Sequence, residues 1–544
     1  MIVDTTLSPS GYVLAFRKIY FQNYIKLRKK FTNWLDKNGD KKNFNWWLSI
    51  PASRNLNLSK LYHYFCIIES IKSIKKADRE DIKEFIIDNN NLREILIKQL
   101  KCNFLITLRE ERKDYFFIKF YQIIKHFIFY FIIFLFSKIF NSQRLNKKKK
   151  YVFIDTFLDG NDLNKNRYYG DKLLEIVKKK NNVLFVPSFF IGMGFINVLK
   201  KIFQCSFNDH YLVKESYLRL DDMYKSFVSL TKNEYQNKKY QMLNNVDYSK
   251  IIYEELKSYK NLAGQIEGWQ NYLFFKNLKL NNISLKKTIN WFENQSLDKG
   301  WNFGVQTFFP NASCYGYQGF TYFPQYMCLN PSTLEYDLKI VPHTILTIGK
   351  RFENTKKEFC NKIKVKTVPA LSFQYLHKRK KKNKLNKIKD SILIILSGFL
   401  NDDVNLIRWI IKSKLHEKNY KISIKEHPIL KIDKIRDIIS DFPKNFITTK
   451  SNFTDAIDLH QILICAGATS ALTELIIQGK YCIIPRINAF DGISLKKLGM
   501  SKNFKIVEKP EELINSLKIK NCKQYRINQF FNKVTKKNLD VFFR

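Results

Sequence analysis

The chain has 544 residues, which is too long for one ordinary core and predicts two or three domains. Hydrophobic residues make up 45% of it and charged residues 26%, so a largely disordered protein is excluded. Lys and Arg number 94 against 49 Asp and Glu, and this formal charge of +45 indicates anionic partners: nucleic acid, anionic lipid or phosphorylated substrates. Because the chain is rich in Lys, Asn, Ile and Phe throughout, background composition is an alternative source of part of the excess.

Residues 1–377 alternate short apolar runs with helical patterns, which predicts a first Rossmann-like domain built on a parallel sheet. The apolar runs predict strands at 44–49, 82–88, 150–156, 182–187, 288–292 and 312–317. Helical patterns cover 58–71, 92–100 and 169–179, and residues 211–259 form a long, largely helical interval.

An aromatic insertion interrupts this domain at about residues 110–148. Its centre, FIFYFIIFLF at 127–136, has no polar face. Twelve residues separate Lys125 from Lys138, and a helix of that length covers about 18 Å, less than the roughly 30 Å of a hydrocarbon core. We therefore expect a shallow or in-plane membrane helix, with a buried core helix as the alternative. The lysines expected to meet anionic headgroups are Lys119, Lys125, Lys138 and Lys147 to Lys150.

The nine cysteines show no CxxC pair and no regular spacing, which indicates a reducing compartment and neither a disulfide scaffold nor a zinc framework. The first residues lack a basic leader followed by an apolar run, so no signal peptide is expected. Together with the insertion, these features predict a cytoplasmic protein that is peripheral on the inner (plasma) membrane.

A lysine-rich linker at 378–390 precedes a second Rossmann-like domain at 391–544. Apolar runs predict strands at 391–396, 421–425, 446–449, 461–465 and 481–485. Helices are expected between the first two strands, at 455–460 and at 470–478, the last capped by Gly479. The predicted fold is thus α/β, with two Rossmann-like domains that face a cleft.

In open α/β sheets, ligands bind beyond the carboxyl ends of the strands, and the first candidate site there is Lys425-Glu426-His427-Pro428. The proline ends the strand and fixes the loop, so that Lys425 and His427 can point into the cleft. A histidine there can bind a phosphate as imidazolium or protonate a departing phosphate oxygen. A turn histidine bonded to local backbone is the alternative.

The second candidate site is residues 466–474, where Gly467 is followed by Thr469 and Ser470 at a helix start. Free backbone N–H groups and the positive end of the helix dipole make this an anion site, and both hydroxyls can donate to a phosphate oxygen. Glu474, one turn further on, can accept hydrogen bonds from ribose hydroxyls. Ordinary helix capping is the alternative for Thr469 and Ser470.

The third candidate site is the segment 292–295, FENQ, in the first half of the chain. Glu293 follows an apolar strand, and a carboxylate there suits a general base that deprotonates an acceptor hydroxyl. Asn294 and Gln295 are expected on the same acceptor side, together with Gln318 and Gly319. Gly316 and Gly319 are expected to let a ligand approach the backbone closely. A surface loop acid is the alternative for Glu293, and Asp155 or Asp159 is then the next candidate base.

With these motifs in place, the C-terminal half resembles the donor domain of GT-B glycosyltransferases. The pairing of His427-Pro428 with Thr469-Ser470 is similar to the HP and Ser-Ser motifs of bacterial sialyltransferases and related capsule enzymes. The FENQ and GYQG segments resemble bacterial surface carbohydrate biosynthesis proteins. The resemblance implies transfer of a sugar, often an acidic one from a CMP-linked donor, onto a lipid-linked or growing glycan, as in capsule or lipopolysaccharide synthesis. Thr469 stands where a serine is usual, and FENQ does not match the acidic motif of sialyltransferases.

The same motifs occur in CDP-glycerol glycerophosphotransferases, so CDP-polyol phosphate transfer is an alternative, as is a non-catalytic nucleotide-binding scaffold. No helix-turn-helix, zinc-finger or RNP motif supports nucleic-acid binding. No cofactor is expected. No metal is expected either, because Asp402-Asp403 lies at a helix start and is better interpreted as a cap than as a metal-binding acidic pair.

Overall fold

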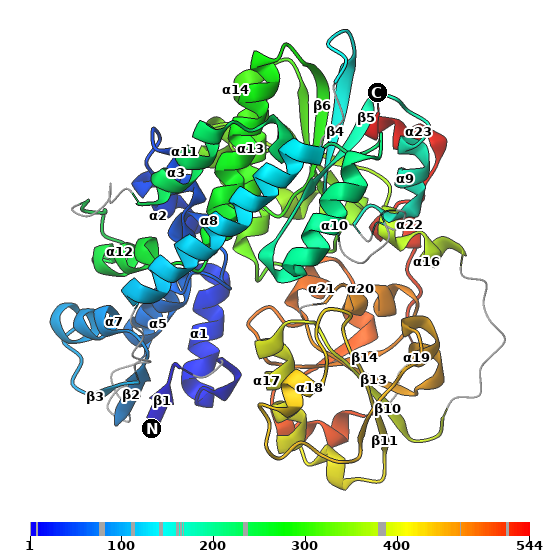
Figure 1. Cartoon of the computed structure of the whole chain (residues 1–544). Coiled ribbons are helices and arrows are strands. Elements are labelled where there is room, and N and C mark those ends of the chain that lie inside the picture. Colours follow the sequence, from blue (N-terminus) through cyan, green and yellow to red (C-terminus); the bar gives the residue numbers. More distant parts are fainter. Residues whose placement is uncertain are drawn as a thin grey trace.

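The structure is a computed structural model that describes residues 2–6, 9–74, 82–109, 115–140, 145–158, 163, 166, 168–231, 238–378, 388–467, 469–517 and 522–543. Most of the predicted basic linker, Asp159 and Ala468 lie outside these residues. Three parallel sheets organise the described residues, two of six strands and one of three (Figure 1). The α/β class with two Rossmann-like domains is therefore confirmed.

The first large sheet has the strand order β5-β4-β6-β7-β8-β9, with every pair of neighbours parallel. Its strands are β4 (Lys150–Phe157), β5 (Val183–Ser188), β6 (Ser284–Trp291), β7 (Ser313–Gln318), β8 (Thr344–Thr347) and β9 (Lys364–Thr367). Four of the predicted strands correspond to β4 to β7. β8 and β9 have no predicted counterpart, and each is only four residues long.

Helices cover this sheet and fill the connections between its strands (Figure 1). They are α8 (Tyr115–Phe140), α9 (Gly170–Val177), α10 (Phe195–Ser206), α11 (Leu220–Thr231), α13 (Leu262–Leu280), α14 (Ser296–Phe308), α15 (Thr333–Asp337) and α16 (Tyr375–Lys378). α13 and α14 pack so closely that a Cβ built on Gly300 would overlap the backbone of Gly268. The predicted helix at 169–179 is confirmed as α9.

The second large sheet has the order β12-β11-β10-β13-β14-β15, which is the strand order 3-2-1-4-5-6 of a Rossmann fold. Its strands are β10 (Ser391–Ile395), β11 (Lys421–Lys425), β12 (Phe446–Thr448), β13 (Ile462–Cys465), β14 (Cys482–Pro485) and β15 (Phe504–Val507). Its helices are α17 (Leu400–Lys412), α18 (Asp433–Arg436), α19 (Phe453–Leu459), α20 (Ser470–Ile477) and α21 (Ile493–Lys497). The five predicted strands are confirmed, and Gly479 follows α20 with a φ of 76°, as its capping role requires.

A smaller unit near the N-terminus has its own three-stranded sheet, with the order β1-β2-β3. It comprises β1 (Ile2–Asp4), β2 (Glu84–Ile87), β3 (Leu105–Leu108), α1 (Leu14–Lys26), α2 (Arg28–Asn38), α3 (Phe44–Leu48), α4 (Ile50–Ser53), α5 (Leu61–Ser73) and α7 (Asn90–Glu94), with α12 (Ser249–Lys257) packed against α4 and α7. The predicted strand at 82–88 is present as β2, but it belongs to this sheet and not to the first large one.

The predicted strand at 44–49 is wrong, because residues 44–48 form helix α3. The aromatic run FNWWL favours a strand by composition. However, the side chain of Asn43 accepts a hydrogen bond from the backbone N–H of Asn45 (2.9 Å) and caps a helix start. The helical turn buries Trp46, Trp47 and Leu48 together, so packing outweighs strand propensity here.

The last described residues return to the first domain. α22 (Ile527–Phe530) and α23 (Lys536–Leu539) lie there, and Asn532 pairs with its backbone: its N–H donates to Ile348 O (2.8 Å), and its carbonyl accepts from Ala370 N (2.9 Å). Further along, Lys287 Nζ donates to Val541 O (2.6 Å). The chain therefore crosses from the first large sheet to the second and back again.

The two large sheets turn their carboxyl ends toward each other. After β7, Thr321 Oγ1 lies 3.3 Å from Ser470 Oγ, and the ring of Tyr326 lies 5.4 Å from that of Phe399, which follows β10. All four residues stand beyond carboxyl ends of strands. This is the two-domain arrangement of the GT-B type that the sequence predicts.

Candidate functional site

Both large sheets have a topological switch point, where the strand order reverses and ligands bind in parallel α/β folds. In the second sheet it lies between β10 and β13, so the loops that flank it are 396–399 and 466–469. In the first sheet it lies between β4 and β6, and the loop after β6 is 292–295. The predicted anion site and the predicted base therefore stand at the two switch points.

His427 follows β11, the neighbour of β10, and its ring lies against Gly398. A Cβ on Gly398 would overlap the imidazole, and Gly398 has a φ of 88°, so glycine suits both the space and the backbone there. Asp403 fixes this loop by accepting hydrogen bonds from Ser397 N (2.7 Å), Ser397 Oγ (2.8 Å) and Gly398 N (2.9 Å). Asp403 therefore binds the loop before α17 and does not cap the helix start, where the N-cap residue Phe399 makes no side-chain hydrogen bond. Through these bonds Asp403 positions the loop that contacts His427.

Lys425, at the end of β11, is half-buried and donates a hydrogen bond to Ser451 O (2.6 Å). Its ammonium group therefore ties β11 to the residues that follow β12. Glu426 accepts a hydrogen bond from Ile432 N (2.7 Å), which closes the turn that holds His427 and Pro428. Lys425 therefore lies beside the candidate site, and its positive charge contributes to the electrostatic potential there.

The loop from Gly467 to Ser470 leads into α20. Thr469 is the N-cap residue, and its Oγ1 accepts from Ala471 N at 3.3 Å, so the capping alternative is realised for Thr469. Ser470 instead faces the first domain through Thr321. Gly467 packs against the buried carboxylate of Asp491, which a Cβ at position 467 would overlap.

Two carboxyl groups behind this loop, those of Asp491 and Glu474, have raised pKa values. Burial raises the pKa of Asp491 to about 7, although its carboxylate accepts hydrogen bonds from Ile487 N (2.8 Å) and Asn488 N (2.6 Å). Burial likewise raises the pKa of Glu474 to about 7, and this carboxylate accepts a hydrogen bond from the hydroxyl of Tyr375 in the first domain. Glu474 therefore already has a partner across the domain boundary, in the place where the sequence predicts ribose hydroxyls.

Glu293 stands just after β6 and is half-buried. Its Oε1 accepts a hydrogen bond from the indole of Trp291 (2.8 Å), while its backbone N–H donates to Asp298 Oδ2 (3.1 Å). Burial, with a smaller contribution from the charge of Glu293, raises the pKa of Asp298 to about 7. Glu293 is thus held on both sides, and the residue is half-buried rather than fully buried, which suits a general base that has to meet a substrate.

The other predicted acceptor-side residues point into the protein. Asn294 and Gln318 are fully buried, and Gln318 Nε2 donates to Leu329 O (2.7 Å). Gln295 is the N-cap residue of α14 in a capping box with Asp298. The space in front of Gly319 is filled by the ring of Trp291, and that in front of Gly316 by Phe292 and Pro342. The expectation that these glycines admit a ligand is therefore wrong: they make room for the protein's own side chains.

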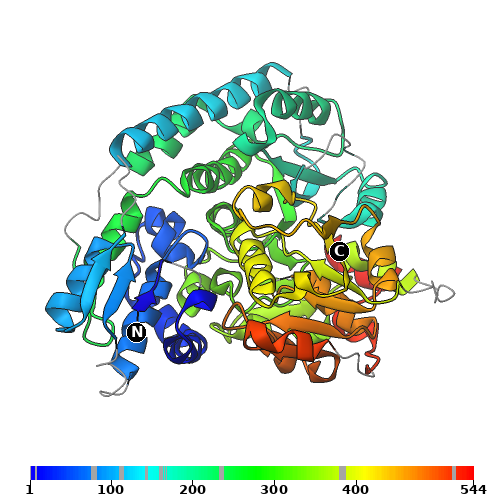
Figure 2. The same cartoon turned by 90° about the horizontal axis from the view of Figure 1, so that it is seen from below.

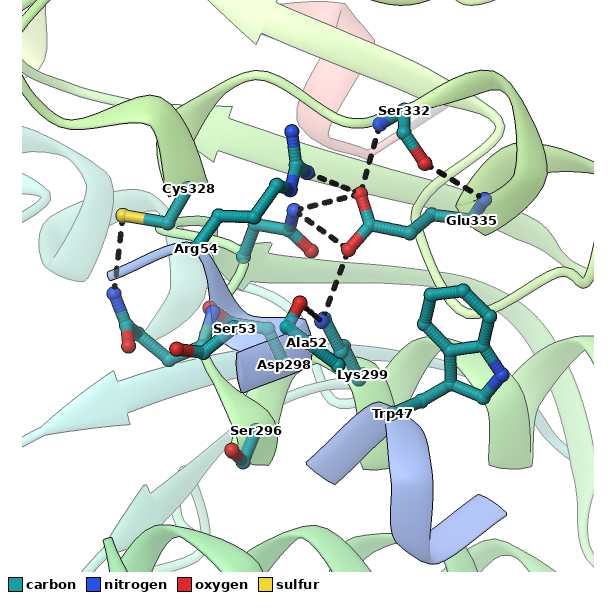
Figure 3. Close-up of polar contacts among 12 residues, drawn as sticks. Trp47, Ala52, Ser53, Arg54, Ser296, Asp298, Lys299, Cys328, Ser332 and Glu335 are labelled. Atoms are coloured by element: carbon teal, nitrogen blue, oxygen red, sulfur yellow. Dashed lines mark hydrogen bonds and ion pairs between the residues drawn. The ribbon is translucent and has the colours of Figure 1, made fainter. Parts of the chain in front are cut away.

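A buried ion cluster around Glu335 anchors this loop (Figure 3). Glu335 pairs with Arg54 and with Lys299 (Nζ to Oε1, 2.9 Å), and it also accepts hydrogen bonds from Asn294 Nδ2 (3.2 Å) and Ser332 N (2.8 Å). Burial alone would raise the pKa of Glu335, but the two cations outweigh it and the pKa is lowered. Asn294 has a φ of 56°, so the FENQ backbone turns sharply where this cluster binds it.

Asp155, the next candidate base, is buried in β4, and burial raises its pKa well above the usual value. Its carboxyl group faces the interior beside Asp298 and Lys214 rather than the other domain. Asp159 lies outside the described residues. Sequence reasoning missed Thr321, Tyr375 and Asp491, because only long-range contacts bring them to the site.

A cavity of about 520 Å³ lies beside the switch points, between the small N-terminal unit and the second domain. It is lined by residues of α1, α5, α17 and the loops after β7 and β14, among them Tyr24, Tyr326, Asp402 and Asn488. None of the predicted site residues lines it. We place the candidate site at the switch points, because the groups suited to phosphate binding and proton transfer stand there.

Among the described residues, no group of three or more His, Cys, Asp or Glu side chains is placed to hold a metal ion. Metal-independent chemistry stays a prediction from the sequence. No protein-family model and no curated protein matches the chain.

Solved structures resemble the chain weakly. MurG of Acinetobacter baumannii is 11% identical, with 68% of this chain and 91% of that chain covered at a TM-score of 0.34. The glycosyltransferase SsfS6 of Streptomyces sp. SF2575 is 9% identical (68% and 90% covered, TM-score 0.33). The N-terminal domain of a Candida albicans trehalose-6-phosphate phosphatase is 11% identical (69% and 90% covered, TM-score 0.34). Likeness at this level carries no argument about activity, which has to be inferred from the chain's own residues.

Replacing Glu335 by Gln should destabilise the protein strongly, because Arg54 and Lys299 lose the buried carboxylate that pairs with both of them. Breaking a buried ion pair on one side costs about 3–5 kcal/mol. Urea unfolding measures the loss. Asp433→Asn, which removes an exposed i,i+3 partner of Arg436, is the control and should leave the unfolding midpoint nearly unchanged. Equal effects of the two substitutions would show that the cluster is not structural.

Asp491 should make stability fall as the pH rises from about 4 to about 7. Its pKa is raised from 3.8 to about 7 in the folded protein, so in that range only the folded state holds the proton and unfolding releases it. Asp491→Asn removes this titration at nearly constant shape. The free energy of unfolding of Asp491→Asn relative to the parent should therefore increase with pH in urea titrations at pH 4.5 and pH 7. A constant difference would contradict the raised pKa.

Proposed function

We propose that the protein is a metal-independent glycosyltransferase of surface-glycan synthesis. In this proposal the second domain binds a nucleotide-activated sugar, with a CMP-linked donor favoured, and the first domain presents the acceptor. The acceptor is a lipid-linked or growing glycan at the cytoplasmic face of the plasma membrane.

The observation that carries the proposal is the coincidence of chemistry and topology. Gly467, Thr469 and Ser470 flank one switch point, Glu293 flanks the other, and the sheets face each other through their carboxyl ends. Residues chosen from the sequence for their chemistry, and for following predicted strands, thus lie at the switch points, where ligands bind in folds of this kind.

The roles of the residues follow from their positions. The α20 helix start receives the donor phosphate, and His427, beside the Gly398 loop, stabilises the negative charge that develops on the phosphate oxygen as it leaves. Glu293 takes the proton of the acceptor hydroxyl while that oxygen forms its bond to the anomeric carbon and the bond from this carbon to the phosphate oxygen breaks. The nucleotide departs as a phosphate, and the sugar remains on the acceptor.

The position of Glu293 fits a base more closely than its neighbours do. Asn294 and Gln318 are fully buried, and Asp155 faces the interior, whereas Glu293 is partly exposed. The bond from Trp291 orients one oxygen of its carboxylate. Asp298 fixes the backbone of the same loop, so Asp298 is a positioning residue in this proposal.

The donor assignment predicts that CMP or CDP raises the melting temperature of the protein more than UDP or GDP at the same concentration. A ligand that binds the folded state stabilises it by mass action, by about 2.7 kcal/mol at a hundredfold excess over Kd. A thermal-shift measurement with the four nucleotides, with and without a chelator, tests this. Equal indifference to all four would remove the donor assignment, and binding lost with the chelator and restored by magnesium would remove the metal-independent mechanism.

The two proposed catalytic residues should differ in their effects. His427→Ala should weaken nucleotide binding modestly and abolish transfer, because the charge on the leaving phosphate loses its partner. Glu293→Gln keeps an acceptor oxygen for Trp291, so nucleotide affinity should stay unchanged while turnover slows roughly a hundredfold or more. Isothermal titration and transfer to a glycolipid fraction measure both quantities.

His416→Ala and Glu417→Gln are matched controls for these variants. Both residues precede β11, at the amino-terminal end of the same sheet, and should leave binding and turnover unchanged. Normal turnover of Glu293→Gln would place the base elsewhere. Transfer of glycerol phosphate from CDP-glycerol would favour the polyol alternative, and nucleotide binding without any transfer would favour a scaffold.

A further inference from the structure

Helix α8 has two apolar faces with different surroundings. One face is core: Phe129, Tyr130, Ile133 and Phe134 are buried against the first domain. On the other face, eight large apolar side chains among the described residues are exposed, with Phe117 at 72% and Ile139 at 73% near the two ends of the helix. The buried face alone would make a core helix, so the exposed face needs a separate explanation.

The exposed face follows one side of the helix for its whole length. Phe117, Tyr121, Ile124, Ile128 and Leu135 recur at intervals of three, four and seven residues and continue to Ile139. A regular helix of this length is about 39 Å long at 1.5 Å per residue. Figure 2 shows α8, in cyan, along the outer edge of the molecule.

Helix α10 extends this face. It packs along α8, and Phe140 and Phe203 bring their rings to 5.5 Å. Its own exposed side carries Ile196 (68% exposed), Phe203 and Phe207, spaced by seven and four residues, while Val198 and Ile202 are buried beneath. The sequence pattern of residues 195–206 gives no separate sign of membrane contact, so this half of the surface comes from the structure alone.

The charge of the two helices has one sign. Neither α8 nor α10 contains an Asp or Glu residue, whereas Lys125 and Lys200 are exposed beside the apolar side chains. The exposed lysines 147–150 follow α8 in the chain. A second copy of this chain would therefore bring lysines against lysines, but anionic lipid headgroups complement them.

Among the described residues, α8 is the one helix long and apolar enough to cross a membrane, and 28% of its most apolar stretch is buried. Its other face is fixed to the domain core, however, and Lys138 donates to Ser216 O (2.6 Å) in the segment before α11. A spanning orientation would pull this face out of the core. The attached position permits only contact along the length of the helix.

We propose that the exposed sides of α8 and α10, here called the α8–α10 face, form a docking surface for an anionic lipid bilayer, with α8 lying in the plane of the interface. The apolar side chains enter the boundary between headgroups and acyl chains, and Lys125 and Lys200 meet the headgroups. The surface is independent of the nucleotide site, so it stands or falls separately from the proposed transfer reaction.

Only exposed residues of the α8–α10 face can be replaced without disturbing the core. Deleting 127–136 would remove Tyr130 and Ile133 from the core, so loss of binding would not separate docking from unfolding. Ile128, Leu135, Ile196 and Phe207 are exposed and can be replaced by Asn together. The matched control replaces Leu105, Leu280, Ile429 and Ile447, which are equally exposed on other elements, by Asn.

Sedimentation with vesicles of equal parts phosphatidylglycerol and phosphatidylcholine measures binding. We expect the parent and the control to bind, and the α8–α10 variant to bind at least tenfold more weakly while its melting temperature stays close to that of the parent. Lys125→Gln with Lys200→Gln should weaken binding to these vesicles severalfold, and added salt should weaken binding of the parent. Equal binding of variant and control would overturn the proposal. Failure of the parent to bind, with self-association that only the α8–α10 variant loses, would assign the face to a second copy.

The in-plane orientation has its own test. Tyr121→Trp and Ile139→Trp place a fluorophore near each end of the exposed face, about 27 Å apart along the helix axis. Lipids brominated at a shallow acyl position should quench both indoles equally, beyond the background of the parent, if α8 lies in the plane. Strong quenching of one position by deep bromines and of the other by shallow ones would overturn the in-plane orientation.

Discussion

The acceptor side of the molecule depends on the ion pairs and hydrogen bonds that the buried carboxylate of Glu335 makes. Arg54 comes from the small N-terminal unit, Lys299 from α14 and Asn294 from the FENQ loop, and all three meet at this one buried group. Two cations and one anion in the interior would leave an excess charge, but Ser332 extends the cluster to the carboxyl group of Asp36 through a hydrogen bond of 2.7 Å. The cluster thus holds three segments, distant in sequence, in one geometry.

This arrangement explains why the FENQ loop could be found from the sequence while the roles of its residues could not. A strand end followed by an acid and two amides predicts chemistry at a sheet edge, and β6 places the loop there. The sequence shows no sign that Asn294 turns inward to Glu335, forty-one residues later in the chain. Glu293 remains partly accessible, and the two amides that follow it tie the loop to Glu335 and to the start of α14.

The fold was predictable where local signals agree. In the second domain each apolar run ends in a turn or a small residue, as at Pro428 and Gly467, and all five expected strands are present. The strand prediction for 44–49 was wrong because the aromatic side chains there suit a strand or a buried helix equally well. The hydrogen bond from Asn45 N to the side chain of Asn43 favours the helix. Helix α8 shows the same ambiguity at larger scale. Core helix and membrane helix are alternatives when the segment is considered alone, but its two faces have different neighbours.

Three acidic side chains lie around the loop from Gly467 to Ser470, the proposed phosphate site, where negative charge would repel a phosphate. Asp491 stands behind Gly467, Glu474 lies one turn into α20, and Asp402 begins α17. Burial raises the pKa of the first two to about 7 and that of Asp402 to about 6, so each carries less negative charge near neutral pH than a solvated carboxylate. An arriving phosphate raises these pKa values further, because like charges disfavour ionisation. On the proposed function, the acids therefore accept protons as the donor binds, and the repulsion that they would exert when ionised is reduced.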